Sequence, residues 1–188
     1  MLEILFLGTG ASIPSRDRAM PSVAVRRGTD IVLFDCGEGT QRQMMISPFS
    51  FMKVKGIFIT HMHGDHFLGL PGLLQTMGLS GRKDKLMVCG PEGLSAGLEA
   101  IFSVCEGRID YELEVTELSH GAEMVFDGFT VSAFRTDHSV PSLGYKISEK
   151  DHRGKFDKKK AAALGLSPGP DFSKLQNGES VGEVTPDM

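Results

Sequence analysis

Short apolar runs bounded by glycine-containing turns recur along the first third of the chain. The first run ends at Gly8-Thr9-Gly10, and the second and third are joined by Arg27-Gly28-Thr29. Four such runs precede His61, where the pattern becomes abruptly polar: residues 2–7, 22–26, 30–35 and 54–60. Runs of this length and composition are typical of buried strands, and the short link predicts that the second and third runs form a hairpin.

Segments with helical spacing alternate with further strand-like runs between residues 38 and 135. Leu70, Leu73 and Met77, for example, repeat at intervals that place them on one helix face. We expect helices at residues 38–46, 67–79 and 91–106, and strands at 85–89, 111–118, 123–126 and 129–135. The last two strands flank Asp127-Gly128, a strong hairpin signal. Strands grouped with intervening helices predict an α/β or α+β sandwich.

Length and composition fit one globular domain. The chain has 188 residues, of which 40% are hydrophobic, which is enough for a core. It has no apolar run near the roughly 20 residues of a membrane span and no basic region at its N-terminus. We therefore expect no membrane anchor, no signal peptide and a cytoplasmic location. Cys36, Cys89 and Cys105 fit neither a disulfide framework nor a zinc knuckle, and we interpret them as reduced core thiols.

Charge is distributed unevenly along the chain. The net charge is 20 minus 24, or −4, so the chain as a whole lacks the positive charge of a nucleic-acid-binding protein. Residues 146–160, however, hold seven basic and three acidic residues, a local net charge of +4. The last 24 residues contain three Pro and four Gly with few apolar residues, too few to supply a core. We expect a packed domain at residues 1–148 and a basic segment at 149–188 that forms a protruding arm or a linker.

The segment directly after the fourth apolar run concentrates metal-binding side chains. Three of the six histidines lie in the window from His61 to His66, which reads His-Met-His-Gly-Asp-His. His61 and His63 lie on one side of an extended segment, while Asp65 and His66 can reach a second position nearby. Imidazole and carboxylate suit zinc or a similar metal, and a hydroxide held between two such ions is a strong nucleophile. A solvated polar turn is the alternative, but a buried strand end does not tolerate four unpaired ionisable groups.

Other polar residues can complete this site. His138 follows the strand expected at 129–135 and can close a three-histidine site with His61 and His63. Asp65 can both bind a metal and accept a proton from water, which makes it the general-base candidate. Asp35 ends a strand and is expected to orient a ligand or to cap the next helix.

Three further features are weaker candidates. Arg16 and Arg18 lie on a loop that can reach phosphate oxygens, although an exposed charged loop explains them equally well. His120 has no neighbouring ligand in the sequence, so we do not expect it in the site. His152 lies in the charged segment and is expected to be solvated.

The string Thr60 to His66 matches the HxHxDH signature of the metallo-β-lactamase superfamily. Further segments make the chain resemble ribonuclease Z, the endonuclease that removes the 3′ trailer from precursor tRNA, over residues 1 to 182. They are FLGTGASIPS, FDCGEGTQRQM, FITHMHGDHFLGLPGLL and LGLSPGPDFSKLQNGESV. The resemblance implies an αββα sandwich and attack of a metal-bound hydroxide on a phosphodiester that leaves a tRNA 3′-hydroxyl.

The resemblance also assigns residues. It implies two zinc ions (Zn²⁺) per complete site, with Asp65 handling the proton of the attacking water. It implies that precursor tRNA is bound by Arg16 and Arg18 near the cleavage site and by an arm that contains Gly169 and Pro170. The zinc ligands that it implies are His61, His63, Asp65, His66 and His138.

The chain departs from the family in two places. The family's PxKxRN loop is Pro14-Ser15-Arg16-Asp17-Arg18-Ala19 here, so contact with the 3′ end of tRNA is expected to differ. The family's bridging aspartate and final histidine ligand, expected after the arm, have no counterpart before Met188. We therefore expect the N-terminal part of the sandwich only. Such a part exposes the inner face of its sheet, so we expect the chain alone to be unstable or to associate, and we expect a homodimer.

Two other functions stay open. One is hydrolysis of small esters or other phosphodiesters on the same fold, against which the arm argues because a small substrate needs none. The other is a non-catalytic RNA-binding fragment with one structural zinc, which the missing ligands favour and the intact signature opposes.

Overall fold

The computed structural model of the chain describes residues 2–105, 107, 109–150 and 156–186. The chain divides into two compact units, Met1–Glu149 and Lys150–Met188. His152 lies outside the described residues, so its expected solvation is not addressed.

A six-stranded sheet forms the centre of the first unit. Its strands lie side by side in chain order: β1 (Leu2–Gly8), β2 (Ser22–Arg27), β3 (Asp30–Phe34), β4 (Val54–Phe58), β5 (Leu86–Gly90) and β6 (Leu113–Glu117). The first three strands pair antiparallel, and β3 to β6 pair in parallel. Parallel pairing brings the carboxyl ends of β3, β4 and β5 to one edge of the sheet, so the residues that follow these strands lie together.

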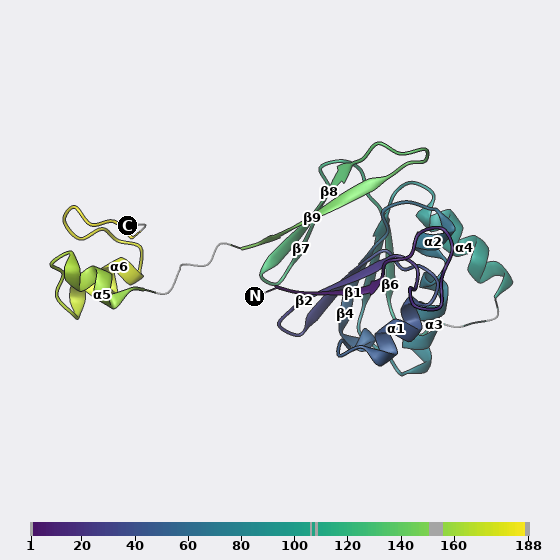
Figure 1. The fold of residues 1–188 in the computed structure, drawn as a ribbon, viewed down its shortest axis with the longest axis horizontal. Coiled ribbons are helices and arrows are strands. Elements are labelled where there is room, and N and C mark those ends of the chain that lie inside the picture. The colour runs from purple at the N-terminus through teal and green to yellow at the C-terminus, as the bar shows by residue number, and fades with distance from the viewer. Residues whose placement is uncertain (1, 106, 108, 151–155, 187–188) are drawn as a thin grey trace. The chain divides into compact units, whose positions relative to one another are not determined.

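Helices cover one face of this sheet (Figure 1). They are α1 (Thr40–Ile46), the 3-10 turn η1 (Phe51–Lys53), α2 (Gly64–Phe67), α3 (Leu70–Leu79) and α4 (Leu94–Val104). Ile57 and Val88 of the sheet pack in one buried cluster with Met44 of α1, Leu73 of α3 and Leu98 of α4. The helix expected at 67–79 is divided, because α2 ends at Phe67 and α3 begins at Leu70.

A three-stranded antiparallel sheet packs on the opposite face (Figure 1). It consists of β7 (Glu123–Phe126), β8 (Phe129–Arg135) and β9 (Leu143–Glu149). The ring of Phe58 in the large sheet lies 6.1 Å from that of Phe126 and 5.3 Å from that of Tyr145, measured between centroids. All helices in the described part of this unit contribute to the other face, so the layers present are helix, sheet and sheet.

The strand β9 was not predicted from the sequence. Leu143, Tyr145 and Ile147 alternate along it: Leu143 is buried, and Tyr145 and Ile147 pack against the cluster between the sheets, while Lys146 is exposed. In the sequence Lys146 groups with the basic segment, because its charge stands out more than a short alternation of apolar residues. In the structure, residues 146–149 of this segment belong to β9 and so to the three-stranded sheet.

The second unit contains two short helices, α5 (Lys158–Ala163) and α6 (Pro170–Gln176). The Asp157 side chain accepts hydrogen bonds from two backbone N–H groups of α5, and so caps its start. The rings of Phe156 and Phe172 lie 5.0 Å apart, and Leu175 is buried. The few apolar residues of this segment predicted no core, yet a small apolar centre forms. Across the described residues of both units, the structure contains no helix long and apolar enough to span a membrane.

Candidate metal centre

Two loops meet at the carboxyl ends of the parallel strands. The backbone N–H of Leu143 donates to the carbonyl oxygen of Thr60 at 2.8 Å, and His61 forms an isolated antiparallel bridge with Ser142. These contacts place the loop from Thr136 to Ser142, between β8 and β9, beside the loop that follows β4. His138 is thereby brought to the histidines of the signature.

Three histidines form a compact group of nitrogen ligands. One ring nitrogen from each of His61, His63 and His138 lies within 4.8 Å of the others. His138 Nε2 and His63 Nδ1 are 3.4 Å apart. Two nitrogens bound to one tetrahedral zinc at about 2.0–2.1 Å would lie about 3.4 Å apart, so this pair fits a single ion. The donor set suits zinc, which takes three histidines and keeps a fourth position open in catalytic sites.

Thr60 orients His61. The ring of His61 is only 8% exposed, and its Nδ1 lies 2.9 Å from the Thr60 hydroxyl. This contact leaves Nε2 of His61 available for a metal ion. Burial, followed by the nearby charge of His66, lowers the pKa of His61 and favours the neutral ring that a metal requires.

Asp65 and His66 form a separate pair beside the histidine group. Their side chains approach to 3.6 Å between Asp65 Oδ2 and His66 Nε2, and the His61 and His66 rings lie 4.1 Å apart between centroids. The pair offers one oxygen and one nitrogen toward a common point. The structure thus brings all five sequence-predicted ligands to one edge of the sheet, three as one group and two as a neighbouring pair.

Asp35 supports both parts of the centre. Its carboxylate lies 2.7 Å from Nδ1 of His66 and accepts hydrogen bonds from the backbone N–H and hydroxyl of Thr60, at 2.7 and 2.9 Å. Burial opposes protonation of His66, but the hydrogen bond and charge of Asp35 outweigh it and raise the pKa of His66. Of the two roles considered from sequence, Asp35 orients a ligand and does not cap α1, whose N-cap is Gly39.

Ser12 holds Asp65 and was missed in the sequence. Its backbone N–H donates to Asp65 Oδ2 at 2.9 Å, and its φ of +58° lies in the left-handed region. Burial alone would raise the pKa of Asp65, but this hydrogen bond and the charge of His66 lower it, so the carboxylate stays ionised. Any residue type except proline can donate a backbone N–H, so the identity of Ser12 did not indicate this contact. The only local signal was the turn at Gly8-Thr9-Gly10.

The remaining candidates lie in different places. Arg16 and Arg18 are exposed on the loop that begins at Ser12, and the Ser15 hydroxyl accepts a hydrogen bond from the Arg18 backbone N–H. Gly169, with a φ of +119°, directly precedes Pro170 at the start of α6.

Two expectations are resolved outside the centre. His120 accepts a hydrogen bond from the Arg135 backbone N–H at 3.3 Å and is not part of the histidine group. Cys36 and Cys89 are buried, but Cys105 is exposed. The prediction that all three cysteines are core thiols is therefore wrong for Cys105, which caps the C-terminal end of α4 and is not part of the core cluster.

Replacing Asp35 with asparagine should weaken zinc binding about 10- to 100-fold, because the charge that orients and polarises His66 is lost. Folding should change little, since asparagine tolerates the Asp35 φ of +60° better than other residues do. Competition with a chromogenic chelator measures the affinity. Asp35→Ala is the comparison and should also lower the melting temperature. A zinc affinity within twofold of the original chain would contradict the role given to Asp35.

Comparisons with known proteins agree on the fold. A family model described as Anti-Pycsar protein Apyc1 matches residues 2–153. Ribonuclease Z of Methanosarcina acetivorans is 48% identical over 181 residues, which are 96% of this chain and 59% of the relative. The crystal structure of human tRNase Z, short form, superposes with a TM-score of 0.70 at 34% identity, covering 80% of this chain and 64% of that one. The metallo-β-lactamase fold protein YhfI from Bacillus subtilis matches with a TM-score of 0.62 at 19% identity, covering 78% and 58% of the two chains.

The expected metallo-β-lactamase fold and the resemblance to ribonuclease Z are both confirmed. The chain spans about three-fifths of the length of the curated relatives that it matches.

Proposed function

The chain belongs to the metallo-β-lactamase-fold family described as Anti-Pycsar protein Apyc1 and is a relative of ribonuclease Z, and on this basis we propose that it takes part in zinc-dependent removal of the 3′ trailer from precursor tRNA. The observation that carries the proposal is the group formed by His61, His63 and His138, with Asp65 and His66 beside it. We infer the substrate, precursor tRNA, from similar proteins that carry the name ribonuclease Z.

The side chains of the candidate metal centre have two kinds of role: some would hold zinc, and others orient those that do. His61, His63 and His138 would hold one zinc ion, and Asp65 and His66 would contribute to a second in a complete site. Zinc, when bound, supplies Lewis-acid chemistry and lowers the pKa of water. Thr60 and Asp35 keep the rings of His61 and His66 in place, so little reorganisation is needed when a substrate arrives.

Asp65 is the residue that we propose as the general base. Its carboxylate accepts a hydrogen bond from Ser12, lies beside His66 and stays ionised. It can therefore accept a proton from the attacking water. The same carboxylate can bind metal, so both roles given to Asp65 are compatible with its position.

Binding of tRNA is assigned to two exposed segments. Arg16 and Arg18 extend from the loop that Ser12 anchors at Asp65, which suits contact with phosphates near the cleaved bond. Gly169 and Pro170 lie in the second unit, which also carries the exposed lysines of α5 and would contact the tRNA body through its phosphates.

The decisive test is to incubate the 188-residue chain with zinc and a precursor tRNA that carries a 3′ trailer. We expect a tRNA that ends in a 3′-hydroxyl at the discriminator base, and a chelator should abolish its formation. Intact precursor tRNA, together with hydrolysis of bis(p-nitrophenyl) phosphate, would instead support a hydrolase of small phosphodiesters. Zinc and tRNA binding without either reaction would support a non-catalytic RNA-binding fragment.

The family match does not decide between precursor tRNA and a small phosphodiester as the substrate. The matching family model carries a name other than ribonuclease Z, although it covers residues 2–153. The family match therefore supports the fold and leaves the choice of substrate to the experiment.

We also propose a cytoplasmic homodimer. Ile4 and Phe6 of β1 are 62% and 68% exposed, and they share the sheet face of Val23 and Val25 that packs toward the smaller sheet. A second copy that covers these side chains would remove apolar surface from water. Sedimentation velocity that shows only monomer at micromolar concentration would contradict the dimer. The cytoplasm fits the free thiols of Cys36 and Cys89, which are typical of a reducing compartment.

A further inference from the structure

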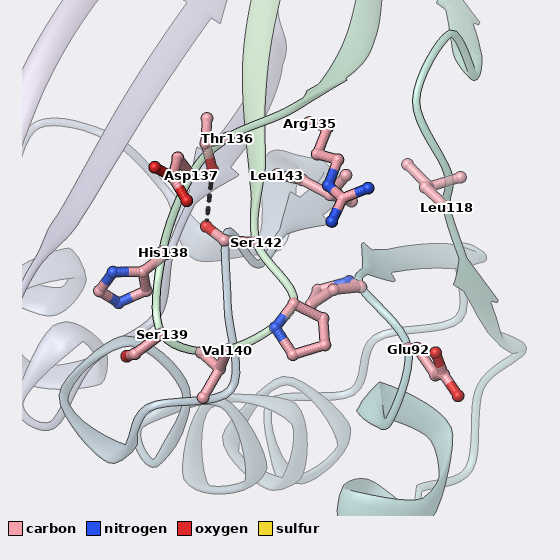
Figure 2. A pocket seen from close by; sticks show the side chains of 12 residues that line it. Glu92, Leu118, Arg135, Thr136, Asp137, His138, Ser139, Val140, Ser142 and Leu143 are labelled. Atoms are coloured by element: carbon pink, nitrogen blue, oxygen red, sulfur yellow. Dashed lines mark hydrogen bonds between the residues drawn. The ribbon is translucent and has the colours of Figure 1, made fainter.

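A pocket of about 840 Å³ lies beside the histidine group on the side of β8 and β9. The loop from Thr136 to Ser142 forms one wall, and a hydrogen bond of 2.8 Å between the hydroxyls of these two residues fixes it (Figure 2). Pro91 and Glu92, which follow β5, and Leu118, which follows β6, form the other wall. His138 lines the pocket and also belongs to the histidine group, so the pocket borders the candidate metal centre.

Arg135 offers a free cation to this pocket. Within the residues that the structure describes, its guanidinium has no hydrogen-bond or ion-pair partner, whereas its backbone N–H is held by His120. Figure 2 shows the guanidinium between Leu143 and Leu118, on the opposite side of the loop from the His138 ring. The cation therefore faces the interior of the pocket, while the ring of His138 faces the metal centre.

We propose that this pocket binds the nucleotide next to the cleaved phosphodiester, with Arg135 contacting the phosphate of that nucleotide and the apolar walls contacting its base. The inference deepens the function proposed above and rests on it for the position of the cleaved bond. It concerns a binding role only, because Arg135 does not contact the histidine group.

The chemistry of the lining favours a nucleotide over a simple anion. A guanidinium forms paired hydrogen bonds with phosphate oxygens, which an unpaired arginine in a pocket is suited to do. Leu118 and Pro141 supply accessible apolar surface for the flat face of a base. The volume falls within the range of small-ligand sites.

The acidic residues of the pocket add selectivity. Glu92 and Asp137 are exposed, and Figure 2 places Asp137 on the far side of the loop from the Arg135 guanidinium. Carboxylates repel a phosphate and accept hydrogen bonds from exocyclic amino groups of bases. The arrangement favours a ligand whose phosphate lies at Arg135 and whose base points toward Glu92.

The test is binding of a single-stranded cytidine trinucleotide, whose bases carry an exocyclic amino group, to the full chain, followed by amide chemical shifts, both with zinc and with a chelator. We expect the largest shifts at Leu118 and in residues 135–143. Arg135→Gln should weaken binding about tenfold, and Arg135→Lys should fall between the two. The matched control is Arg42→Gln, which removes the same charge from exposed α1 and should change the affinity less than twofold.

Three results would overturn the inference. These are equal losses in the Arg135 and Arg42 variants, shifts that avoid the pocket, and inorganic phosphate binding as tightly as the trinucleotide. The last would show that the pocket recognises only an anion. The chain could bind the trinucleotide through Arg135 and still leave precursor tRNA intact. That result would support the pocket and contradict the proposed function.

Discussion

Replacing His63 with alanine should lower the zinc affinity of the chain by at least about 100-fold. The described centre offers three clustered nitrogens, and His63 lies 3.4 Å from His138, the spacing expected for two ligands of one ion. Two histidines cannot hold zinc tightly. Loss of a residue that only hydrogen-bonds to a ligand lowers metal affinity about 10- to 100-fold, and loss of a ligand should lower it more. Equilibrium competition with a chelator of known affinity measures the change.

The control for this experiment is His120→Ala. His120 is exposed, lies outside the histidine group and accepts only the backbone N–H of Arg135. Its replacement should leave zinc affinity unchanged, and circular dichroism should show the same fold in both variants. Zinc affinity that survives in His63→Ala would show that the metal is held elsewhere. Equal losses in both variants would point to a general effect of the substitutions rather than to ligation.

Replacing Gly69 with alanine should destabilise the chain by about 3 kcal/mol or more. A Cβ at Gly69 would lie 2.0 Å from the carbonyl oxygen of Gly37. This oxygen belongs to the backbone, so it cannot move away by a change of side-chain rotamer. Gly69 also donates its N–H to the carbonyl of Cys36 at 2.9 Å, and Cys36 donates to the carbonyl of His66 at 2.8 Å. These contacts hold the segment after β3 against the signature loop, so zinc affinity should fall together with stability.

Gly72→Ala is the matched control three residues further along. Gly72 lies inside α3, and a Cβ there would meet only the flexible end of Gln41, at 3.3 Å. Since alanine favours a helix over glycine by about 1 kcal/mol, this variant should be as stable as the original chain or slightly more so. Urea denaturation of the two variants measures the difference. Similar midpoints for both would contradict the close approach of the two loops.

The ligands of the centre could be predicted because their signal is local. His61, His63, Asp65 and His66 follow one apolar run within six residues, and a strand end in a parallel sheet is a common place for a site. His138 was predicted from a similar position after a second run. Short apolar runs bounded by turns likewise predicted the first eight strands, because such runs are typical of buried strands.

The supporting contacts could not be predicted, because each joins residues far apart in the sequence. Ser12 reaches Asp65 through a backbone N–H, and Asp35 reaches His66 across 31 positions. Sequence alone suggested that Asp35 orients a ligand, but it did not identify which one.

The amino-acid sequence by itself determined the fold class, the candidate ligand residues and the resemblance to ribonuclease Z, because apolar runs and a short histidine motif are formed by residues that are neighbours in the sequence. Only the tertiary structure decided that β9 closes the smaller sheet and that its pairing with Thr60 carries His138 to His63. It also decided that Arg135 faces a pocket beside the centre. Such contacts depend on how strands pair and loops meet in space, which the order of residues along one strand does not specify.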